Sequence, residues 1–498
     1  MRSWVFYTSI IGMIVGMISG MFVIPEKHFF ISGIGIGVGT GWSILLYKQL
    51  LAKKILPIII LFFCSFVVGF WRVDQFHRHY PFDAFDQYNN QTITLVGVVA
   101  DAPIIKPGSQ SVRIHPQGID GEKMPEESRD IFLKVSDLET FNPGDQVVVS
   151  GKFSLRENFL SETGRTVQYR LMSYSKRIAG DISFPKIIEH IPDSKNPLIF
   201  FVTIKNKFVT TLQQLFLDPA AGLLAGIMIG DTSNLTGNFL DMFRAVGLIH
   251  IVVLSGYNIT LIAGVFSKMF APMGYFRRIV AAVIALVLFI AVVGISQTAL
   301  RAGIMALAAF AAHYFVRPYA VTRAIFLALI IMVWTSPYAL LFDLSLQLSF
   351  LATFGIVYIF PLLQEKYSSL IETEMGEIFL QTIAVNILTL PIIVYQMGYF
   401  SLLSFPVNIA VLGFMPLLTV GGFIAVVIGI VNLSLGKLVA FPLQVITDSI
   451  IKLVTWSANH DPFKISVPMF SLTLLISMYL LIGCWVFKQL HKKPSTPL

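Results

Sequence analysis

The sequence predicts a polytopic α-helical membrane protein of about twelve spans that carries one inserted, extracytoplasmic, all-β domain with an OB-like fold. Hydrophobic residues make up 55% of the 498 residues and charged residues only 13%, whereas soluble domains carry about 25% charged residues. Long apolar runs flank a single polar stretch. The net charge of +8 reports loop charge and topology in such a chain, not a nucleic-acid footprint.

The first 71 residues are expected to form the N-terminal transmembrane helices. Apolar runs at 4–24, 29–50 and 55–70 have the length and composition of spans. No small-residue cleavage site follows the first run, which favours a retained helix over a signal peptide. The lysines after the second run place that turn in the cytoplasm and the following insertion outside. Arg2 conflicts with this arrangement, so either one of the first two runs is re-entrant or Arg2 is a weak topology signal, and the lysine-rich turn is the stronger signal.

Residues 72–196 form the polar insertion. Its strand-like runs are separated by Pro-Gly and Gly-Asp turns, as at Pro143-Gly144-Asp145. Five short strands in an insertion of this size predict a small barrel of the OB type. The expected strands are 92–100, 111–115, 131–135, 146–153 and one near 177–182.

Basic and aromatic side chains alternate in the C-terminal half of this insertion. Cations that follow a phosphate backbone, combined with rings on which bases stack, are what single-stranded nucleic acid requires. The alternative is a solvated barrel face, because acidic residues elsewhere in the insertion balance the charge. The candidate DNA-binding residues are Lys152, Phe153, Arg156, Arg165, Tyr169, Arg170, Lys176 and Arg177.

Three further regions follow the insertion. Residues 197–217 predict an amphipathic helix in the membrane interface, 218–487 a transmembrane core, and 488–498 a basic cytoplasmic tail. The run at 402–431 is expected to be one broken helix or a re-entrant pair. The apolar runs of the core are 246–270, 279–295, 298–316, 324–341, 344–363, 378–397, 402–431, 438–456 and 467–487.

The core carries polar groups at membrane depth, where a charged side chain costs about 2.5–3.5 kcal/mol at a helix centre on insertion scales. Several helices each contribute one polar stripe, which predicts a bundle around a polar pathway, and therefore a channel or a transporter. The polar residues considered are Arg244, His250, Ser255, Asn258, Gln297, Arg301, Asp343, Gln347 and Asn386.

Some of these polar residues have alternative roles. Arg301 and Asp343 are expected to form a structural ion pair, which would also remove a carboxylate from a path for anions. His250 and Ser255 could belong to a membrane-embedded hydrolase, but no carboxylate has a matching position, so neither a catalytic residue nor a metal site is expected. A secondary transporter for a small anionic solute explains Arg301 but not the external barrel.

Several motifs resemble those of the ComEC-type competence protein family, in the family's order. GIMIGDTSNL and FRAVGLIHIVVLSGYNI resemble its core segment, and GISQTALRAGIM a second block with Arg301 at the arginine position. DLSLQLSFLATFG and LPIIVYQMGYFSLLSFPVNIAVLGFMPL resemble a third and a fourth, and FNPGDQVVVSGKF in the insertion resembles the family's external OB-type domain.

The resemblance implies a channel, not an enzyme, that imports single-stranded DNA across the cytoplasmic membrane in natural transformation. The external domain would engage DNA, and the helical core would form the conduit. By position, the conduit candidates are His250, Ser255, Gly256, Arg301, Asp343 and Gln347.

The sequence departs from the family pattern at two places. SGYNI stands where the family has SGLHV, so Asn258 replaces a histidine and a titratable role there is doubtful. No metal-binding histidine cluster of the metallo-β-lactamase type occurs, so no cofactor is expected. Degradation of the second strand would therefore need a separate nuclease. The other expected partners are single-stranded DNA, membrane lipid, a DNA receptor and a cytoplasmic translocation motor, and the oligomeric state stays open.

Overall fold

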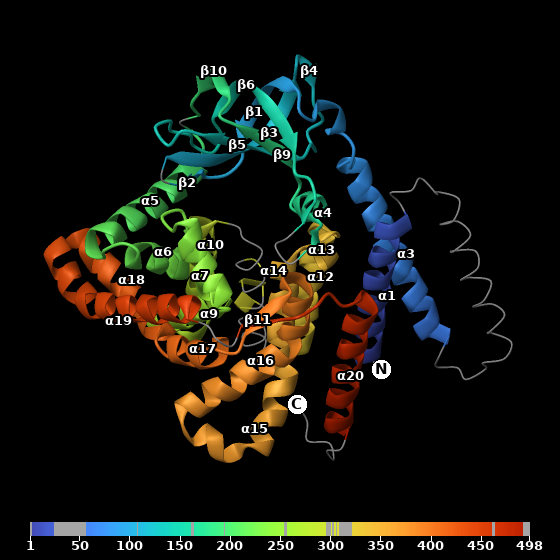
Figure 1. The fold of residues 1–498 in the computed structure, drawn as a ribbon, viewed down its shortest axis with the longest axis vertical. Coiled ribbons are helices and arrows are strands. Elements are labelled where there is room, and N and C mark those ends of the chain that lie inside the picture. The colour runs from blue at the N-terminus through green and yellow to red at the C-terminus, as the bar shows by residue number, and fades with distance from the viewer. Residues whose placement is uncertain are drawn as a thin grey trace.

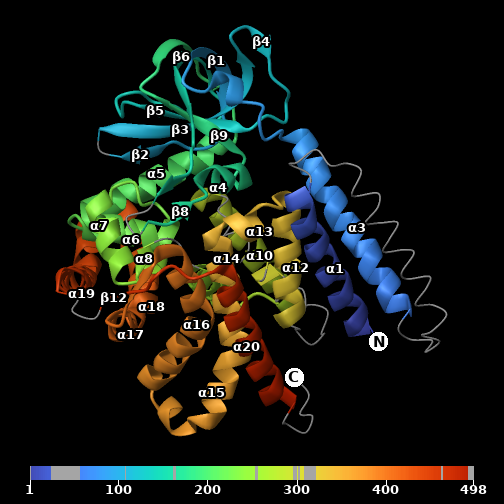
Figure 2. The same ribbon diagram turned by 45° about the vertical axis from the view of Figure 1, so that its right-hand side comes forward.

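The computed structural model describes residues 2–23, 56–106, 108–160, 164–193, 195–252, 256–294, 300, 303–304, 306–307, 321–460 and 464–491. A small β domain sits on one end of a larger assembly of helices (Figure 1). The pair α1 (Arg2–Val23) and α3 (Leu56–His79) flanks that assembly on one side, as Figure 2 shows after rotation.

The β domain is a closed five-stranded barrel. Strand β1 pairs with β3, β3 with β5, β5 with β9, β9 with β6, and β6 returns to β1. Only the β5–β9 pair in this circuit is parallel. The five strands are β1 (Thr92–Val99), β3 (Ser109–Ile119), β5 (Asp130–Val135), β6 (Gln146–Leu155) and β9 (Ile178–Ser183). All five predicted strands are confirmed, because alternating apolar side chains such as Leu95, Leu133 and Val149 fill the interior.

Smaller elements decorate the barrel. Strands β2 (Ile104–Lys106) and β4 (Glu122–Lys123) pair with β3, and β10 (Lys186–Ile191) pairs with β6. The segment between β6 and β9 contains the hairpin β7 (Phe159–Leu160) and β8 (Thr166–Val167), followed by α4 (Tyr169–Ser175). A short 3-10 turn, η2 (Asp86–Tyr88), precedes the barrel.

The helices form a multi-pass membrane protein. In the described residues seven helices are long and apolar enough to span a membrane, or up to eight if a bent pair counts as one span. About twelve spans are therefore not shown, and the expected runs at 29–50 and 298–316 lie largely or wholly outside the described residues. The helices after the barrel are α5 (Leu198–Leu215), α6 (Ala220–Ile229), α7 (Gly237–Ala245), α8 (Ile249–Val252), α9 (Gly256–Met269), α10 (Tyr275–Val293), α12 (Val321–Thr335), α13 (Ala339–Phe342), α14 (Leu344–Phe354), α15 (Phe360–Lys366), α16 (Glu374–Met397), α17 (Ser404–Leu412), α18 (Met415–Val431), α19 (Leu433–Asn459) and α20 (Leu472–His491).

Several expected spans are interrupted. The run at 324–341 ends as α12 at Thr335, because Pro337 cannot continue the helix and the residue before a proline leaves helical geometry. The run at 402–431 is two helices, α17 and α18, bent by 42°, which confirms the expected break. The helix that starts with α14 continues through a π turn, η3 (Gly355–Ile359), into α15.

The centre of the helical part is α6, in which every residue is buried. Helices α5, α8, α18 and α19 pack around it, and Met228 contributes to the same apolar cluster as Leu418 and Leu443. A second small sheet, β11 (Tyr399–Ser401) with β12 (Lys464–Ser466), joins the segments that follow α16 and precede α20, while a 3-10 turn, η4 (Ser368–Glu372), links α15 to α16.

Candidate functional site

Most of the predicted DNA-binding residues of the insertion are engaged within the protein. Phe153 is fully buried in the barrel interior, so its ring cannot stack on a ligand and that prediction is corrected. Arg165 is 8% exposed and donates to the carbonyl oxygens of Val467 and Pro468 at 3.4 and 3.5 Å. These carbonyls belong to the helical part, so this arginine attaches the barrel to the core.

The other predicted cations divide into bonded and exposed groups. Arg170 binds both carboxylate oxygens of Asp86, at 2.6 and 2.8 Å. Arg156 binds both carboxylate oxygens of Asp181, at 2.7 and 2.5 Å. The guanidinium of Arg177 donates to the carbonyl oxygen of Thr335 at 2.6 Å. Lys152 and Lys176 are exposed, and neither ammonium forms an ion pair within the part of the chain that the structure describes, so both can meet a phosphate.

One face of the barrel carries alternating cations and aromatic rings. The guanidinium carbon of Arg156 lies 5.6 Å from the ring centroid of Tyr169 and 5.1 Å from that of Phe132. The ammonium of Lys134 lies 5.6 Å from the ring centroid of Phe184. Phe132 and Lys134 are alternate residues of β5, so both point outward. We call Tyr169, Arg156, Phe132, Lys134 and Phe184 the cation–aromatic row.

Sequence reasoning found Arg156 and Tyr169 but missed the other three members of the row. The missed signal was the alternation in β5, where Ile131, Leu133 and Val135 are inward and buried. The same alternation places Phe132 and Lys134 on the outer face of β5. Phe184 is 62% exposed and lies in the turn before β10, which was not predicted as a strand.

The row is extended by two exposed lysines. Lys186 of β10 pairs in register with Ser150 of β6. Lys152 lies two residues further along β6 and therefore faces the same side. Both lysines are exposed, so positive charge continues from Phe184 toward β6.

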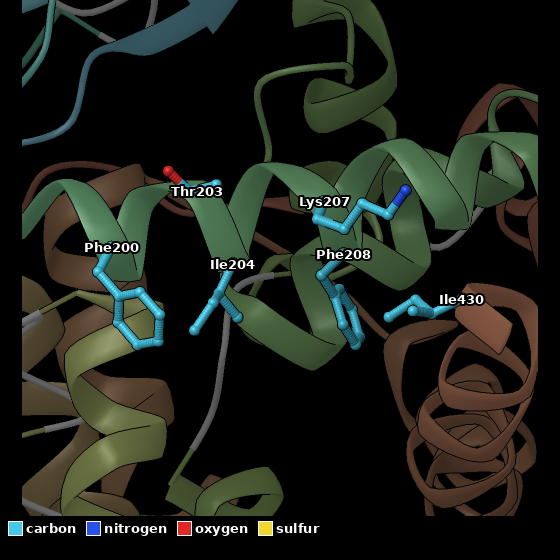
Figure 3. A pocket seen from close by; sticks show the side chains of 6 residues that line it. All are labelled: Phe200, Thr203, Ile204, Lys207, Phe208 and Ile430. Carbon is cyan, nitrogen blue, oxygen red and sulfur yellow. The ribbon is translucent and has the colours of Figure 1, made fainter.

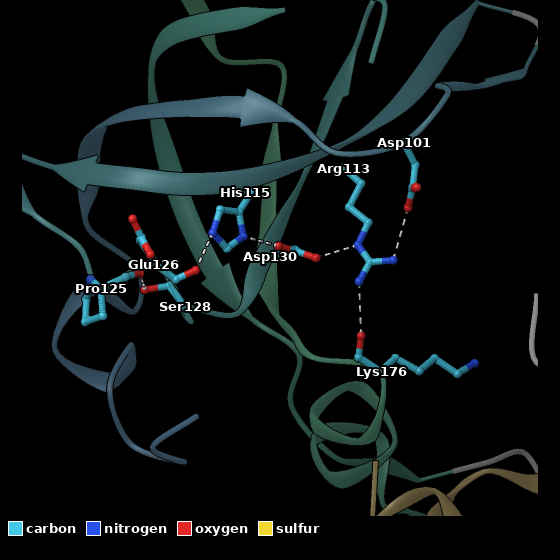
Figure 4. Close-up of polar contacts among 8 residues, drawn as sticks. All are labelled: Asp101, Arg113, His115, Pro125, Glu126, Ser128, Asp130 and Lys176. Atoms are coloured by element: carbon cyan, nitrogen blue, oxygen red, sulfur yellow. Dashed lines mark hydrogen bonds and ion pairs between the residues drawn. The ribbon is translucent and has the colours of Figure 1, made fainter. Parts of the chain in front are cut away.

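A partly buried polar network on the outer face of the barrel connects β3 and β5 (Figure 4). Asp130 receives the Nε–H of Arg113 at 2.7 Å and contacts Nδ1 of His115 at 2.9 Å. The other ring nitrogen of His115 contacts the carbonyl oxygen of Glu126 at 2.7 Å. Arg113 also reaches the carbonyl oxygen of Lys176 at 3.4 Å. Both nitrogens of His115 are occupied, so this histidine–carboxylate pair is structural and not arranged as a general base.

A cluster of aromatic and cationic groups joins the barrel to the helices. Nε2 of His77 on α3 lies 2.6 Å from the hydroxyl of Tyr338, and the hydroxyl of Tyr174 on α4 lies 3.2 Å from Nδ1 of His77. Arg129 is 2% exposed and lies 5.3 Å from the ring centroid of Tyr174. Burial lowers the pKa of Arg129 to about 10, so this guanidinium remains cationic at neutral pH.

The conduit candidates around α8 and α9 have different surroundings. Asn258 is fully buried, and its Nδ2 donates to the carbonyl oxygen of Ile227 at 2.9 Å, which ties α9 to α6. His250 is exposed, and its Nδ1 lies 3.0 Å from the carbonyl oxygen of Gly247. Arg244 is exposed and forms an ion pair with Asp241, while Gly256 is the first residue of α9.

The candidates on the later helices serve helix ends and turns. Asp343 is 3% exposed and caps α14 by accepting the N–H groups of Ser345 and Leu346 at 2.9 and 3.3 Å. Gln347 donates to the carbonyl oxygens of Leu340 and Leu341 at 3.0 and 2.8 Å. The amide of Asn386 donates to the carbonyl oxygen of Thr382, one turn earlier in α16.

Ser255, Gln297 and Arg301 lie outside the described residues, so their predicted roles remain predictions. The proposed ion pair between Arg301 and Asp343 is among them. In the described part of the chain no group of three or more His, Cys, Asp or Glu side chains is placed to hold a metal ion. The described candidates are therefore polar groups along helices and a cationic, aromatic barrel face.

Comparison with known proteins gives a consistent assignment. Over 221 residues, 43% of this chain, the sequence is 23% identical to ComE operon protein 3 of Bacillus subtilis (strain 168). The alignment covers 27% of that relative's length. No solved structure matches the chain. The model of the Competence protein family matches residues 227–492, more than half of the 498 residues, and the chain therefore belongs to the Competence protein family.

Proposed function

We propose that this protein is a channel that imports single-stranded DNA across the cytoplasmic membrane, with the barrel outside and the helical core as the conduit. Membership of the Competence protein family supports a role in DNA uptake during transformation. The observation that carries the proposal is the cation–aromatic row on the barrel. Such a surface binds phosphates through its cations and stacks bases on its rings, whatever their sequence.

The topology of the barrel supports this use of the row. Counted along the chain, the second and third long strands are β3 and β5, and the loop between the fourth and fifth runs from β6 to β9. In OB folds these two strands and the corresponding loop are the places that bind oligonucleotides. The row starts in that loop at Tyr169 and Arg156 and crosses β5 at Phe132 and Lys134.

The helical core offers a compatible environment for a polyanion. A free carboxylate on the path would repel each passing phosphate. Asp343, however, directs its carboxylate to the N-terminus of α14, where N–H groups and the helix dipole stabilise its charge. Asn386 and Gln347 are neutral, and His250 is exposed. Moving a polyanion also requires an energy source, for which a cytoplasmic motor is the expected partner.

Binding of DNA to the purified full-length protein tests the role of the row. We expect Lys134→Gln combined with Phe184→Ala to weaken binding of a labelled oligonucleotide by about tenfold, since stacking alone contributes about 1–3 kcal/mol per base. A plot of the logarithm of the association constant against the logarithm of the salt concentration has a negative slope. The magnitude of this slope should fall by about 0.7, the contribution of one phosphate contact on a single strand. Fluorescence anisotropy measures both quantities.

The matched control is Lys123→Gln on β4, another exposed lysine of the barrel that is not in the row. It should leave affinity nearly unchanged. Equal losses in both variants would show only a general effect of charge.

The function itself is tested by uptake of labelled DNA into a deletion strain complemented with the chain or with the row variant. Unchanged internalisation after deletion would contradict the proposal and favour transport of a small anionic solute.

A further inference from the structure

Helix α5, which connects the barrel to the helical core, has an open apolar groove along one side (Figure 3). The groove has a volume of about 330 Å³ and is lined by Phe200, Thr203, Ile204, Lys207, Phe208 and Ile430. Phe200, Ile204 and Phe208 recur every four residues and extend from the same side of α5. Ile430 reaches the groove from the end of α18.

The apolar wall of the groove is exposed. Phe200 is 64% exposed, Ile204 40% and Ile430 47%. Residues 197–217 are expected to form an amphipathic helix in the membrane interface, and the apolar face of such a helix lies against acyl chains.

A cation stands at the edge of this apolar surface. Lys207 is exposed, and no ion pair is formed by it among the residues that the structure describes. Lys205, two residues earlier, differs because its ammonium lies 3.1 Å from a carboxylate oxygen of Asp231. Lys207 therefore places a positive charge beside a groove whose apolar lining suits an acyl chain.

We propose that this groove binds one anionic phospholipid, with an acyl chain against Phe200, Ile204 and Phe208 and the phosphate at Lys207. A ligand with one anionic and one apolar end is the chemistry that satisfies both features. The bound lipid fixes the orientation of α5. Because Lys205 on the same helix pairs with Asp231 after α6, lipid in the groove also stabilises the position of α5 on the core.

Photolabelling of the purified full-length protein in nanodiscs tests this site. The probe is phosphatidylglycerol with a diazirine in one acyl chain. We expect the label on peptides from α5 and the end of α18, and unlabelled phosphatidylglycerol should compete about fivefold better than phosphatidylcholine. That factor corresponds to about 1 kcal/mol for one lysine near an anionic lipid surface. Lys207→Gln should abolish the preference.

Two further variants make the result decisive. Lys452→Gln removes another exposed lysine, on α19, and should leave the preference unchanged. Ile430→Trp should fill the groove and remove the label from α5 without altering label elsewhere. Label spread evenly over all lipid-facing helices, or unaffected by Ile430→Trp and Lys207→Gln, would overturn the site in favour of ordinary boundary lipid. The readout requires no DNA, so it stands apart from the proposed transport function.

Discussion

Two arginines meet the C-terminal end of α12. Arg177 donates to the carbonyl oxygen of Thr335 at 2.6 Å, and Nε of Arg72 donates to that of Trp334 at 2.7 Å. The last carbonyls of a helix have no partner within the helix and carry partial negative charge. The two guanidiniums supply these missing donors, one from the barrel side and one from α3, and so attach both to the core.

Arg177→Ala is expected to loosen this attachment. Loss of a hydrogen bond from a charged donor costs about 1.5–3 kcal/mol. Hydrogen exchange of the full chain should show faster exchange in α4 and around residues 334–336, while the barrel strands keep their protection. Lys176→Ala, which removes the exposed neighbouring cation, is the control. Equal protection in both variants would mean that Arg177 contributes nothing to the junction.

Asp145 closes the end of the barrel near its exit to α5. Its carboxylate accepts the N–H groups of Asn142 and Asp193 at 2.8 and 2.9 Å and contacts Nε2 of His190 at 2.9 Å. Burial opposes the charge of Asp145, but these hydrogen bonds outweigh it and lower the pKa of the carboxyl group. The Pro143-Gly144-Asp145 turn thus also anchors β10.

Because the pKa of Asp145 is lowered, the stability of this end of the barrel should decrease as the pH falls. The stabilisation is complete above the pKa of the unfolded chain, about 3.9, and is lost as pH falls through the lower pKa of the folded state. The protection factors of the amides at 186–193, which compare the observed exchange rate with the intrinsic rate at the same pH, should therefore fall below about pH 4. In Asp145→Asn the segment should exchange faster at neutral pH and respond less to acid, and an unchanged acid response would contradict this role.

Residue roles were harder to predict than residue positions. The basic and aromatic composition of the insertion was evident in the sequence, but Arg165 and Arg177 bind carbonyls of the helical core instead of facing solvent. A guanidinium can donate to a carbonyl oxygen as well as to a phosphate, so the residue type alone does not distinguish the two roles. The choice depends on which segment lies opposite in the folded chain, and those segments are more than 150 residues away in sequence.

At the scale of elements, glycine determines how α1 and α3 pack. A Cβ at Gly16 would collide with the carbonyl oxygen of Phe66, and one at Gly69 with that of Met13. The backbones of the two helices are therefore in direct contact. Small residues at such crossings permit close approach in membranes, where apolar burial alone does not drive helix association.

Gly16→Leu is expected to separate this helix pair and to destabilise the protein. Overpacking a closely packed site costs about 1–3 kcal/mol, and here the obstruction is backbone, which cannot rotate away. Thermal unfolding in detergent should shift to lower temperature. The control is Gly264→Leu on α9, where an added Cβ meets nothing within 4 Å. A shift of equal size in the control would indicate a general intolerance of leucine.

The elements differed in how well the sequence predicted them. The five barrel strands were predicted because alternation of apolar residues has a period of two and is unambiguous. Helix continuity in the core was less predictable, because hydropathy reports apolar character and not breaks. The separation of α12 from α13 around Pro337 and the turn before α8 both occur within apolar sequence.

At the scale of the molecule, barrel and core are separate in composition but joined by specific bonds. In the described chain, attachment occurs where α3 enters the barrel, where β10 leads into α5, and where the β6–β9 segment meets residues 334–336 and 467–468. The proposed transport would require DNA to pass from the row on the barrel to the helices, so the junction determines the geometry of transfer.

A variant of the junction should separate binding from transport. His77→Ala removes the contact between α3 and the hydroxyls of Tyr174 and Tyr338 but lies outside the row. We expect oligonucleotide affinity within about twofold of the native protein and a clear loss of internalised DNA in complemented cells. His460→Ala is the control, because this exposed histidine lies just after α19 and contacts Trp456 of that helix. Parallel loss of both activities would argue that the barrel itself had been damaged.

The three attachments also have a mechanical meaning. A rigid body held at one point turns about any axis, and one held at two points still swivels about the line between them. A third point off that line removes the remaining rotation. The hairpin segment that carries Arg165 and α4 supplies such a point. The barrel is thus fixed to the core at three points. It can reorient relative to the membrane only if one of these attachments is released.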